Sequence, residues 1–256
     1  MQQKRSLLIH QEPNVYVNEA FGDVCFAAFI ANLRAILGKK QPAIVVDIGS
    51  GGGEYSKLLG GLYETYVGLE PSDIPLGRKM DNTPDGSSVL VHYDPSKRIP
   101  ICDSCADVVM FISSYDHILE RSAVIAEASR ILVPNGYLVI GMTNYSFWAK
   151  RLANWLAGGK RFMHDHDHYC VHTPDSLKQE VQGFDPSLRF NETRADFFFA
   201  PNVPHYLGWV YFSAYVIRLI DRILRLIIRV MLGVENAGSA MFVVFRKTEN
   251  SKQGES

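Results

Sequence analysis

A strand followed by a run of small residues constrains this chain more than any other stretch. Residues 43–48 are almost entirely apolar and rich in β-branched side chains, which predicts a strand buried on both faces. The next five residues read Gly-Ser-Gly-Gly-Gly, and residues 54–61 then have the pattern of a helix. A glycine turn between a strand and a helix lets backbone N–H groups approach a ligand closely. In a doubly wound sheet such a turn lies beside the ligand crevice.

The spacing of the glycines indicates which ligand the turn binds. A dinucleotide fingerprint, G-x-G-x-x-G, needs a glycine where Glu54 or Ser56 stands, so it does not fit. The pattern that fits is acid-x-G-x-G-x-G, with Asp47 ahead of Gly49, Gly51 and Gly53. It resembles the first motif of class I S-adenosylmethionine (SAM)-dependent methyltransferases, in which a carboxylate at the strand end attracts the positive charge of SAM. The alternative is a generic glycine-rich turn with a solvated aspartate.

A second carboxylate supports the resemblance. Residues 65–69 predict a short strand that ends at Glu70, 19 residues after Gly51. An acid about 20 residues past the turn can bind both hydroxyls of an adenosine ribose. The resemblance therefore implies SAM as cofactor, bound by Asp47, Gly49, Ser50, Gly51, Gly53, Glu70, Pro71, Asp94 and Ser113. Lys97 stands where the family often has a carboxylate, which departs from the pattern around Asp94.

The order of predicted elements is more specific than any motif. Helices are predicted at 15–38 (ended by Gly38), 54–61 and 119–132, and strands at 43–48, 65–69, 88–93, 107–112, 137–141, 187–193 with 195–200, and 239–246. Residues 134–136, Pro-Asn-Gly, should end the helix at 119–132 in a turn before the fifth strand, and asparagine tolerates the left-handed backbone of such a turn. The resemblance covers about residues 43–142 and implies an α/β fold with a doubly wound, seven-stranded, mostly parallel sheet and an antiparallel last strand.

We expect one methyltransferase domain over residues 1–250. Its core would be 40–143, followed by a variable acceptor-side region, 144–237, with a helical insertion before the last strand at 239–246. Residues 248–256 are polar and predict a disordered tail.

Histidines gather between residues 163 and 172, at positions 164, 166, 168 and 172. Three interpretations remain: a metal site, a catalytic or substrate-binding loop, and a solvated polar loop. Alternation along a strand would turn the intervening aspartates away from the histidines, so we expect no metal. His168 or His172 precedes a Thr-Pro-acid sequence similar to one in glycan- and small-molecule-modifying relatives. Thr173 and Pro174 also fit a helix start. His117, after the fourth strand, and His168 are the candidate bases.

Composition and charge argue against some classes of partner and some cellular locations. The formal net charge is −1, which gives no electrostatic basis for a nucleic-acid partner. Four cysteines are too few for a disulfide scaffold, and the N-terminus has no apolar core of a secretory signal. We therefore expect a cytoplasmic protein.

Residues 206–232 are the unusual feature. The charged positions 218, 221, 222, 225 and 229 fall within about a third of a helix circumference at about 100° per residue, and nearly all others are apolar. Five charges and two upstream prolines exclude a single helix that crosses a membrane. The segment is either a helix packed on the domain, a lid over an apolar substrate, or a helix in a membrane interface, which would place the protein at a membrane surface.

The sequence thus predicts a SAM-dependent methyltransferase that moves a methyl group to an oxygen or nitrogen of a small, lipid-linked or glycan acceptor. The alternative is a SAM-binding protein without turnover, acting as a sensor or a membrane-associated partner.

Overall fold

One seven-stranded sheet organises the computed structural model of the chain. The structure describes residues 19–71, 87–147, 169–196 and 240–249 and the single positions 151, 155, 223, 226, 227, 230, 231, 233 and 238. The strands are β1 (Ile44–Ile48), β2 (Thr65–Glu70), β3 (Ser87–His92), β4 (Ala106–Ile112), β5 (Leu132–Thr143), β6 (Leu188–Asp196) and β7 (Ala240–Lys247). Their spatial order is β3-β2-β1-β4-β5-β7-β6. Strand β7 is antiparallel to β5 and β6, and the pairs among β1 to β5 are parallel. The predicted fold class is confirmed.

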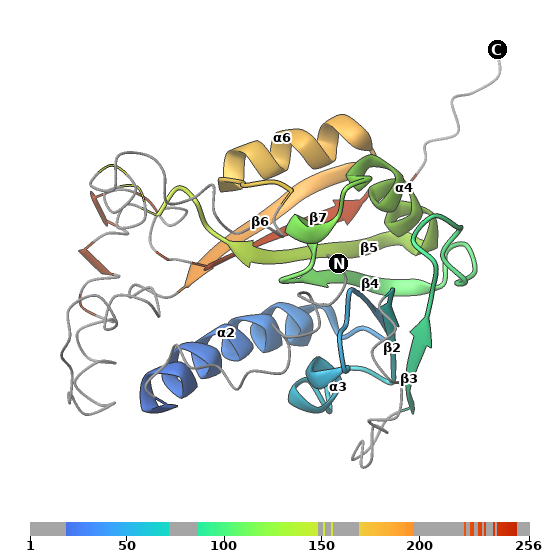
Figure 1. Cartoon of the computed structure of the whole chain (residues 1–256), viewed down its shortest axis with the longest axis horizontal. Coiled ribbons are helices and arrows are strands. Elements are labelled where there is room, and N and C mark those ends of the chain that lie inside the picture. Colours follow the sequence, from blue (N-terminus) through green and yellow to red (C-terminus); the bar gives the residue numbers. More distant parts are fainter. Residues whose placement is uncertain are drawn as a thin grey trace, which may run out of the picture.

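Helices cover both faces of the sheet (Figure 1). Helices α2 (Glu19–Lys40) and α3 (Glu54–Leu58) lie on one face, and α4 (Arg121–Ile131) and α6 (Pro174–Phe184) on the other. Buried side chains of α2 pack with Val45 and Tyr66, whereas those of α4 and α6 pack with Val46 and Val109. Because successive strand residues point to opposite faces, the apolar runs of β1 and β4 supply both cores. A short 3-10 turn, η1 (Tyr115–His117), follows β4.

The ends of two helices differ from the prediction. Helix α2 runs through Gly38 to Lys40, and the chain leaves it at Gln41, whose φ of 47° is left-handed and whose N–H donates to the carbonyl of Leu37 at 2.9 Å. A glycine therefore does not end this helix, because the left-handed residue lies three positions later. Helix α3 stops at Leu58, not at Gly61.

Strand β5 shows the largest difference. The Pro-Asn-Gly stretch lies inside the strand, which begins directly after α4. Ala106 pairs with Leu132 but Val108 pairs with Tyr137, so residues 133–136 bulge out of the ladder. Asn135 takes the expected left-handed conformation, with φ of 67°. The predicted break is thus a bulge within a continuous strand.

Other expectations have mixed outcomes. Strand β6 is one continuous strand through residue 196. Thr173 caps α6 and Pro174 follows it, as predicted. Cys102 and Cys105 form a disulfide that the cysteine count did not predict. Most of the acceptor-side region 144–237, including most of 206–232, and residues 250–256 lie outside the described residues. Among the described residues, no helix has the length and apolarity needed to cross a membrane.

Candidate cofactor and active site

Three glycines in left-handed conformation form the turn after β1. Gly49, Gly51 and Gly53 have φ values of 77°, 55° and 75°. A side chain on Gly49 would place its Cβ 2.5 Å from the Cβ of Ser114. Residues with a side chain rarely adopt this conformation, so glycine is required at Gly49 both for the backbone and for the close approach. The turn therefore presents bare backbone at the carboxyl edge of β1.

Glu70 closes this turn from the neighbouring strand. Its Oε2 accepts the N–H of Gly51 at 2.7 Å. The carbonyl of Leu69 accepts the N–H groups of Gly49 and Ser50 at 2.8 and 3.1 Å. The end of β2 and the glycine turn are thus bound together, and the carboxylate lies beside the turn, as the 19-residue spacing predicted.

Asp47 is buried within β1, with 1% of its surface exposed. The hydroxyl of Tyr66 donates to its Oδ2 at 2.5 Å. The two side chains meet because β1 and β2 pair in parallel, with Asp47 opposite Gly68. The alternative of a solvated aspartate is therefore wrong. Tyr66 was missed, since only the strand register brings it to Asp47.

Two further residues at this edge were not predicted. A Cβ on Gly68 would lie 2.5 Å from Leu90 Cδ2 and 2.6 Å from the hydroxyl of Ser50, which is itself buried. Tyr93 is also buried, and its N–H donates to the carbonyl of Glu70 at 3.3 Å. Burial and the charge of Glu70 raise the pKa of Tyr93 to about 12, so its phenol stays protonated at neutral pH. A glycine inside an apolar strand is the signal that could have identified Gly68.

The loop after β4 is tied to the same edge. Ser113, predicted as a cofactor contact, has a left-handed φ of 54°, and its N–H donates to the carbonyl of Gly141 at 2.7 Å. The hydroxyl of Ser114 donates to the carbonyl of Ile48, the last residue of β1, at 2.6 Å. A serine in this conformation persists only where its surroundings hold it, and such positions cluster at functional sites.

Asp94 and Pro71 stand apart from this cluster. Asp94 accepts bonds from the N–H and hydroxyl of Ser96, at 3.0 and 2.7 Å, and pairs with Lys97 at 3.3 Å. The hydrogen bonds from Ser96, aided by Lys97, lower the pKa of Asp94. Its described contacts are thus within its own turn, and the order β3-β2-β1 separates the end of β3 from the glycine turn by one strand. Pro71 is exposed directly after β2.

His117 lies in η1 at the carboxyl end of β4. Its side chain is 46% exposed, and its Nε2 lies 3.9 Å from Oδ1 of Asp116, which is buried. The carbonyl of Asp116 accepts the N–H of Tyr169 at 2.8 Å, which joins the loop to the segment before α6. The 3.9 Å between Nε2 of His117 and Oδ1 of Asp116 exceeds the distance of a hydrogen bond, so what the loop offers is an accessible imidazole with a buried carboxylate near it. Asp116 was not predicted from the sequence.

Glu180 of α6 joins three elements behind this loop. Its carboxylate accepts bonds at 2.9 Å from the hydroxyl of Tyr115 and from Nε of Arg121. Nε2 of His172 lies 3.3 Å from the same carboxylate, and Nδ1 of His172 lies 3.2 Å from the hydroxyl of Ser176. We call these residues the Glu180 cluster. It fixes η1 against α4 and α6.

The position of His172 decides part of the histidine question. It is 6% exposed, with Nδ1 at hydrogen-bond distance from Ser176 and Nε2 buried beside the Glu180 carboxylate, so a solvated role is wrong for this residue. Burial lowers the pKa of His172, although the charge of Glu180 opposes the shift. His164, His166 and His168, the second candidate base, lie outside the described residues. Within the described ranges, no group of three His, Cys, Asp or Glu side chains is arranged to hold a metal ion.

The chain was compared with models of known protein families. Residues 21–186 match a family model described as a methyltransferase domain. The chain belongs to this family. It is a methyltransferase, and its fold is that of SAM-dependent methyltransferases.

Solved structures agree with the fold of the methyltransferase. A methyltransferase in complex with the Trm112 activator from Haloferax volcanii superposes with a TM-score of 0.56 at 14% identity, covering 90% of this chain and 94% of that one. The YcgJ protein of Bacillus subtilis gives 0.56 at 11% identity, with 86% and 98% covered. A SAM-dependent methyltransferase from Archaeoglobus fulgidus gives 0.53 at 18% identity, with 86% and 94% covered. A search of curated proteins finds no significant match.

Proposed function

We propose that the methyltransferase holds SAM on the glycine turn between Asp47 and Glu70. The hydrogen bond between Gly51 and Glu70 carries the proposal, because it fixes a carboxylate beside the backbone of the glycine turn. Glu70 is placed to accept the ribose hydroxyls, and buried Asp47 supplies negative charge toward the sulfonium and ammonium. Gly49, Ser50, Gly51 and Gly53 supply the close approach. Pro71, Asp94 and Ser113 are proposed outer contacts.

The chemistry proposed is methyl transfer to an oxygen or nitrogen. When bound, SAM supplies an electrophilic methyl group, so the protein mainly aligns the acceptor and excludes water. His117, the accessible imidazole at the carboxyl end of β4, is proposed to take the proton from an acceptor hydroxyl. His168 remains the second candidate for this role.

We further propose an apolar, lipid-linked or glycan acceptor reached at a membrane surface. Five side chains at helical spacing are exposed: Ile223, Leu226, Ile227, Val230 and Met231, between 46% and 79%. Positions i, i+3, i+4, i+7 and i+8 lie on one side of a helix. An apolar side left open to solvent, in a segment that also carries four arginines in its sequence, suits an anionic bilayer interface.

Turnover tests the proposed activity. The protein is incubated with SAM and a lipid or glycan extract, and S-adenosylhomocysteine is measured. We expect product with one extract and a loss of about 10²- to 10⁴-fold for His117→Gln, with SAM affinity unchanged. SAM binding without product in every extract would favour the non-catalytic sensor, and full activity of His117→Gln would leave alignment alone as the mechanism.

A further inference from the structure

The loop between β3 and β4 holds two cysteines that methyl transfer does not use. Cys102 and Cys105 form a disulfide that closes a ring around Asp103 and Ser104. Their Cα atoms are 5.8 Å apart, within the range that disulfides span, so the backbone holds both thiols in bonding position. The ring precedes β4, so it lies at the amino edge of the sheet, opposite the glycine turn.

The ring is anchored to the end of α4. The N–H groups of Ser104 and Cys105 donate to the carbonyls of Arg130 and Ile131 at 3.0 and 2.8 Å. These carbonyls belong to the last two residues of α4, which have no partner within the helix. Ser104 holds a left-handed φ of 52° to make this contact. The cysteine ring therefore acts as a cap for α4.

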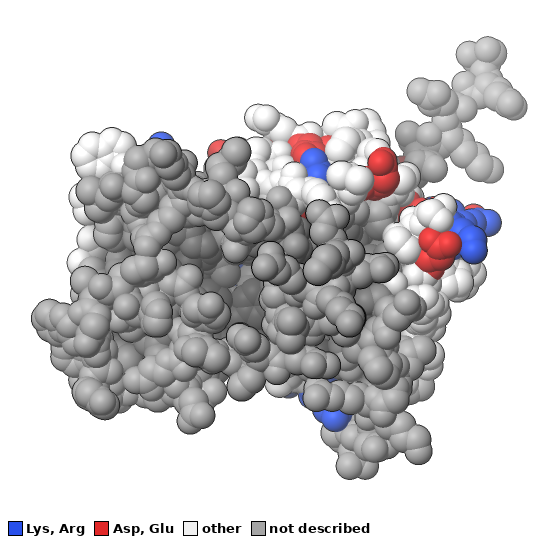
Figure 2. Space-filling view, in the orientation of Figure 1, with Lys and Arg blue, Asp and Glu red and all other residues white. Residues whose placement is uncertain are grey.

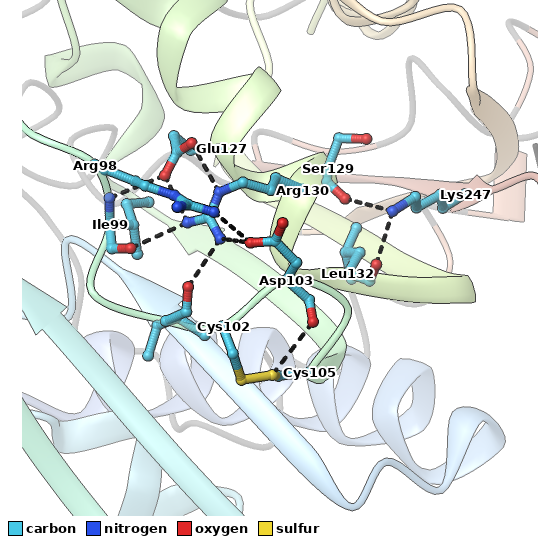
Figure 3. A network of polar contacts seen from close by, with 11 residues as sticks. Arg98, Ile99, Cys102, Asp103, Cys105, Glu127, Ser129, Arg130, Leu132 and Lys247 are labelled. Atoms are coloured by element: carbon cyan, nitrogen blue, oxygen red, sulfur yellow. Dashed lines mark hydrogen bonds and ion pairs between the residues drawn. A yellow bond between two sulfur atoms is a disulfide. The ribbon is translucent and has the colours of Figure 1, made fainter.

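Arg130 organises the charges around the ring. Figure 2 shows acidic and basic side chains beside one another at the right edge of the molecule, where this loop lies in Figure 1. Figure 3 shows from close by that Arg130 donates to Asp103 at 2.6 Å, to Glu127 at 2.9 and 2.7 Å, and to the carbonyl of Ile99 at 3.0 Å. Arg130 also donates to the carbonyl of Ile101 at 2.8 Å. Arg98 pairs with the same Asp103 carboxylate. This network holds the loop in place from both sides of the ring.

We propose that Cys102 and Cys105 are a reversible thiol–disulfide exchange site for a low-molecular-weight disulfide of the glutathione class. Cys102 is exposed whereas Cys105 is only partly exposed, so the thiolate of Cys102 attacks first. A mixed disulfide forms and one thiolate leaves. The thiolate of Cys105 then attacks the sulfur of Cys102, the ring closes and the second thiolate leaves. The protein loses two electrons and two protons, and the small disulfide is reduced to two thiols.

Oxidation of the two cysteines stabilises the cap of α4 and leaves the affinity for SAM unchanged. Closing a four-residue ring removes conformational freedom from the opened loop, so local opening becomes rarer by on the order of tenfold. The amides of Ser104 and Cys105 exchange hydrogen correspondingly more slowly in the disulfide form. SAM affinity stays unchanged, because the glycine turn lies at the opposite edge of the sheet.

Cys170 provides an internal comparison. It is a free cysteine, and burial raises its pKa to about 11, so little thiolate forms at neutral pH. The full-length protein is equilibrated in glutathione buffers of graded ratio, alkylated, and analysed by peptide mass spectrometry. We expect Cys102 and Cys105 to become protected together, reversibly, while Cys170 stays free.

Single variants test the order of attack. Cys105→Ser should accumulate one glutathione on Cys102, whereas Cys102→Ser should accumulate little on Cys105, and Cys170→Ser should titrate like the wild type. The proposal is overturned if both thiols remain alkylatable at every ratio, if the adduct forms on Cys105 instead, or if oxidation leaves the exchange of the Ser104 and Cys105 amides unchanged.

Discussion

Glycine-to-alanine substitutions separate conformational strain from steric collision at the cofactor edge. At Gly49 a φ of 77° is combined with a Cβ position 2.5 Å from Ser114. Gly68 has such a collision without a positive φ, whereas Gly61 has a φ of 79° with no atom within 4 Å of the Cβ position. Gly183 has neither the positive φ nor the collision. Left-handed backbone costs about 1–2 kcal/mol for a residue with a side chain. Overpacking costs about 1–3 kcal/mol. We therefore expect Gly49→Ala to lower the free energy of unfolding by about 2–5 kcal/mol.

The other three positions are the controls. Gly61→Ala should cost about 1–2 kcal/mol, and Gly68→Ala about 1–3 kcal/mol. Gly183 lies in α6, so alanine there should raise stability by up to about 1 kcal/mol. Urea unfolding followed by circular dichroism gives the four values. The explanation of the glycine turn is refuted if Gly49→Ala is no less stable than Gly61→Ala.

The remaining predictions concern the membrane segment and the Glu180 cluster. The wild-type protein should co-sediment with anionic but not with neutral vesicles, and salt should release it. The double variant Leu226→Glu with Val230→Glu should stay in the supernatant, and the control Val89→Glu on β3 should behave as the wild type. Wild-type protein that stays in the supernatant with every vesicle would contradict the membrane proposal. Because the pKa of His172 is lowered in the folded state, the unfolded chain binds more protons below about pH 6.5, and stability should fall from pH 7 to 5. His172→Asn should flatten that dependence, and an unchanged slope would contradict it. Glu180→Gln should cost about 1–3 kcal/mol in urea unfolding by weakening its bond from Arg121, and no cost would show that the pair is dispensable.

Local sequence patterns predicted most of the sheet. The continuous apolar runs of β1 and β4 fix their existence, and their lengths agree within one residue because polar and glycine residues bound them. The predicted start of β5 was wrong because Pro-Asn-Gly has the composition of a turn, whereas β4 pairs with β5 on both sides of the bulge and keeps the strand continuous. Tertiary pairing overrode a local signal there.

The site was predictable where a motif has a fixed spacing. The contact between Gly51 and Glu70 follows from the two strand ends that their spacing indicates. Contacts that depend on strand register or on long sequence separation were not predictable. Tyr66 reaches Asp47 only through the pairing of β1 and β2, and Glu180 reaches Tyr115 and Arg121 across 65 and 59 residues.

SAM affinity, measured by isothermal titration calorimetry, tests the proposed cofactor site most directly. Glu70→Gln can keep the bond to Gly51 but loses the charge, and Asp47→Asn can keep the bond from Tyr66, so each should weaken SAM binding on the order of tenfold or more with the fold intact. Glu64→Gln is the matched control, because Glu64 is exposed and directly precedes the opposite end of the same strand. We expect the control to bind like the wild type. Wild-type affinity in both Glu70→Gln and Asp47→Asn would contradict the assignment of SAM to this edge.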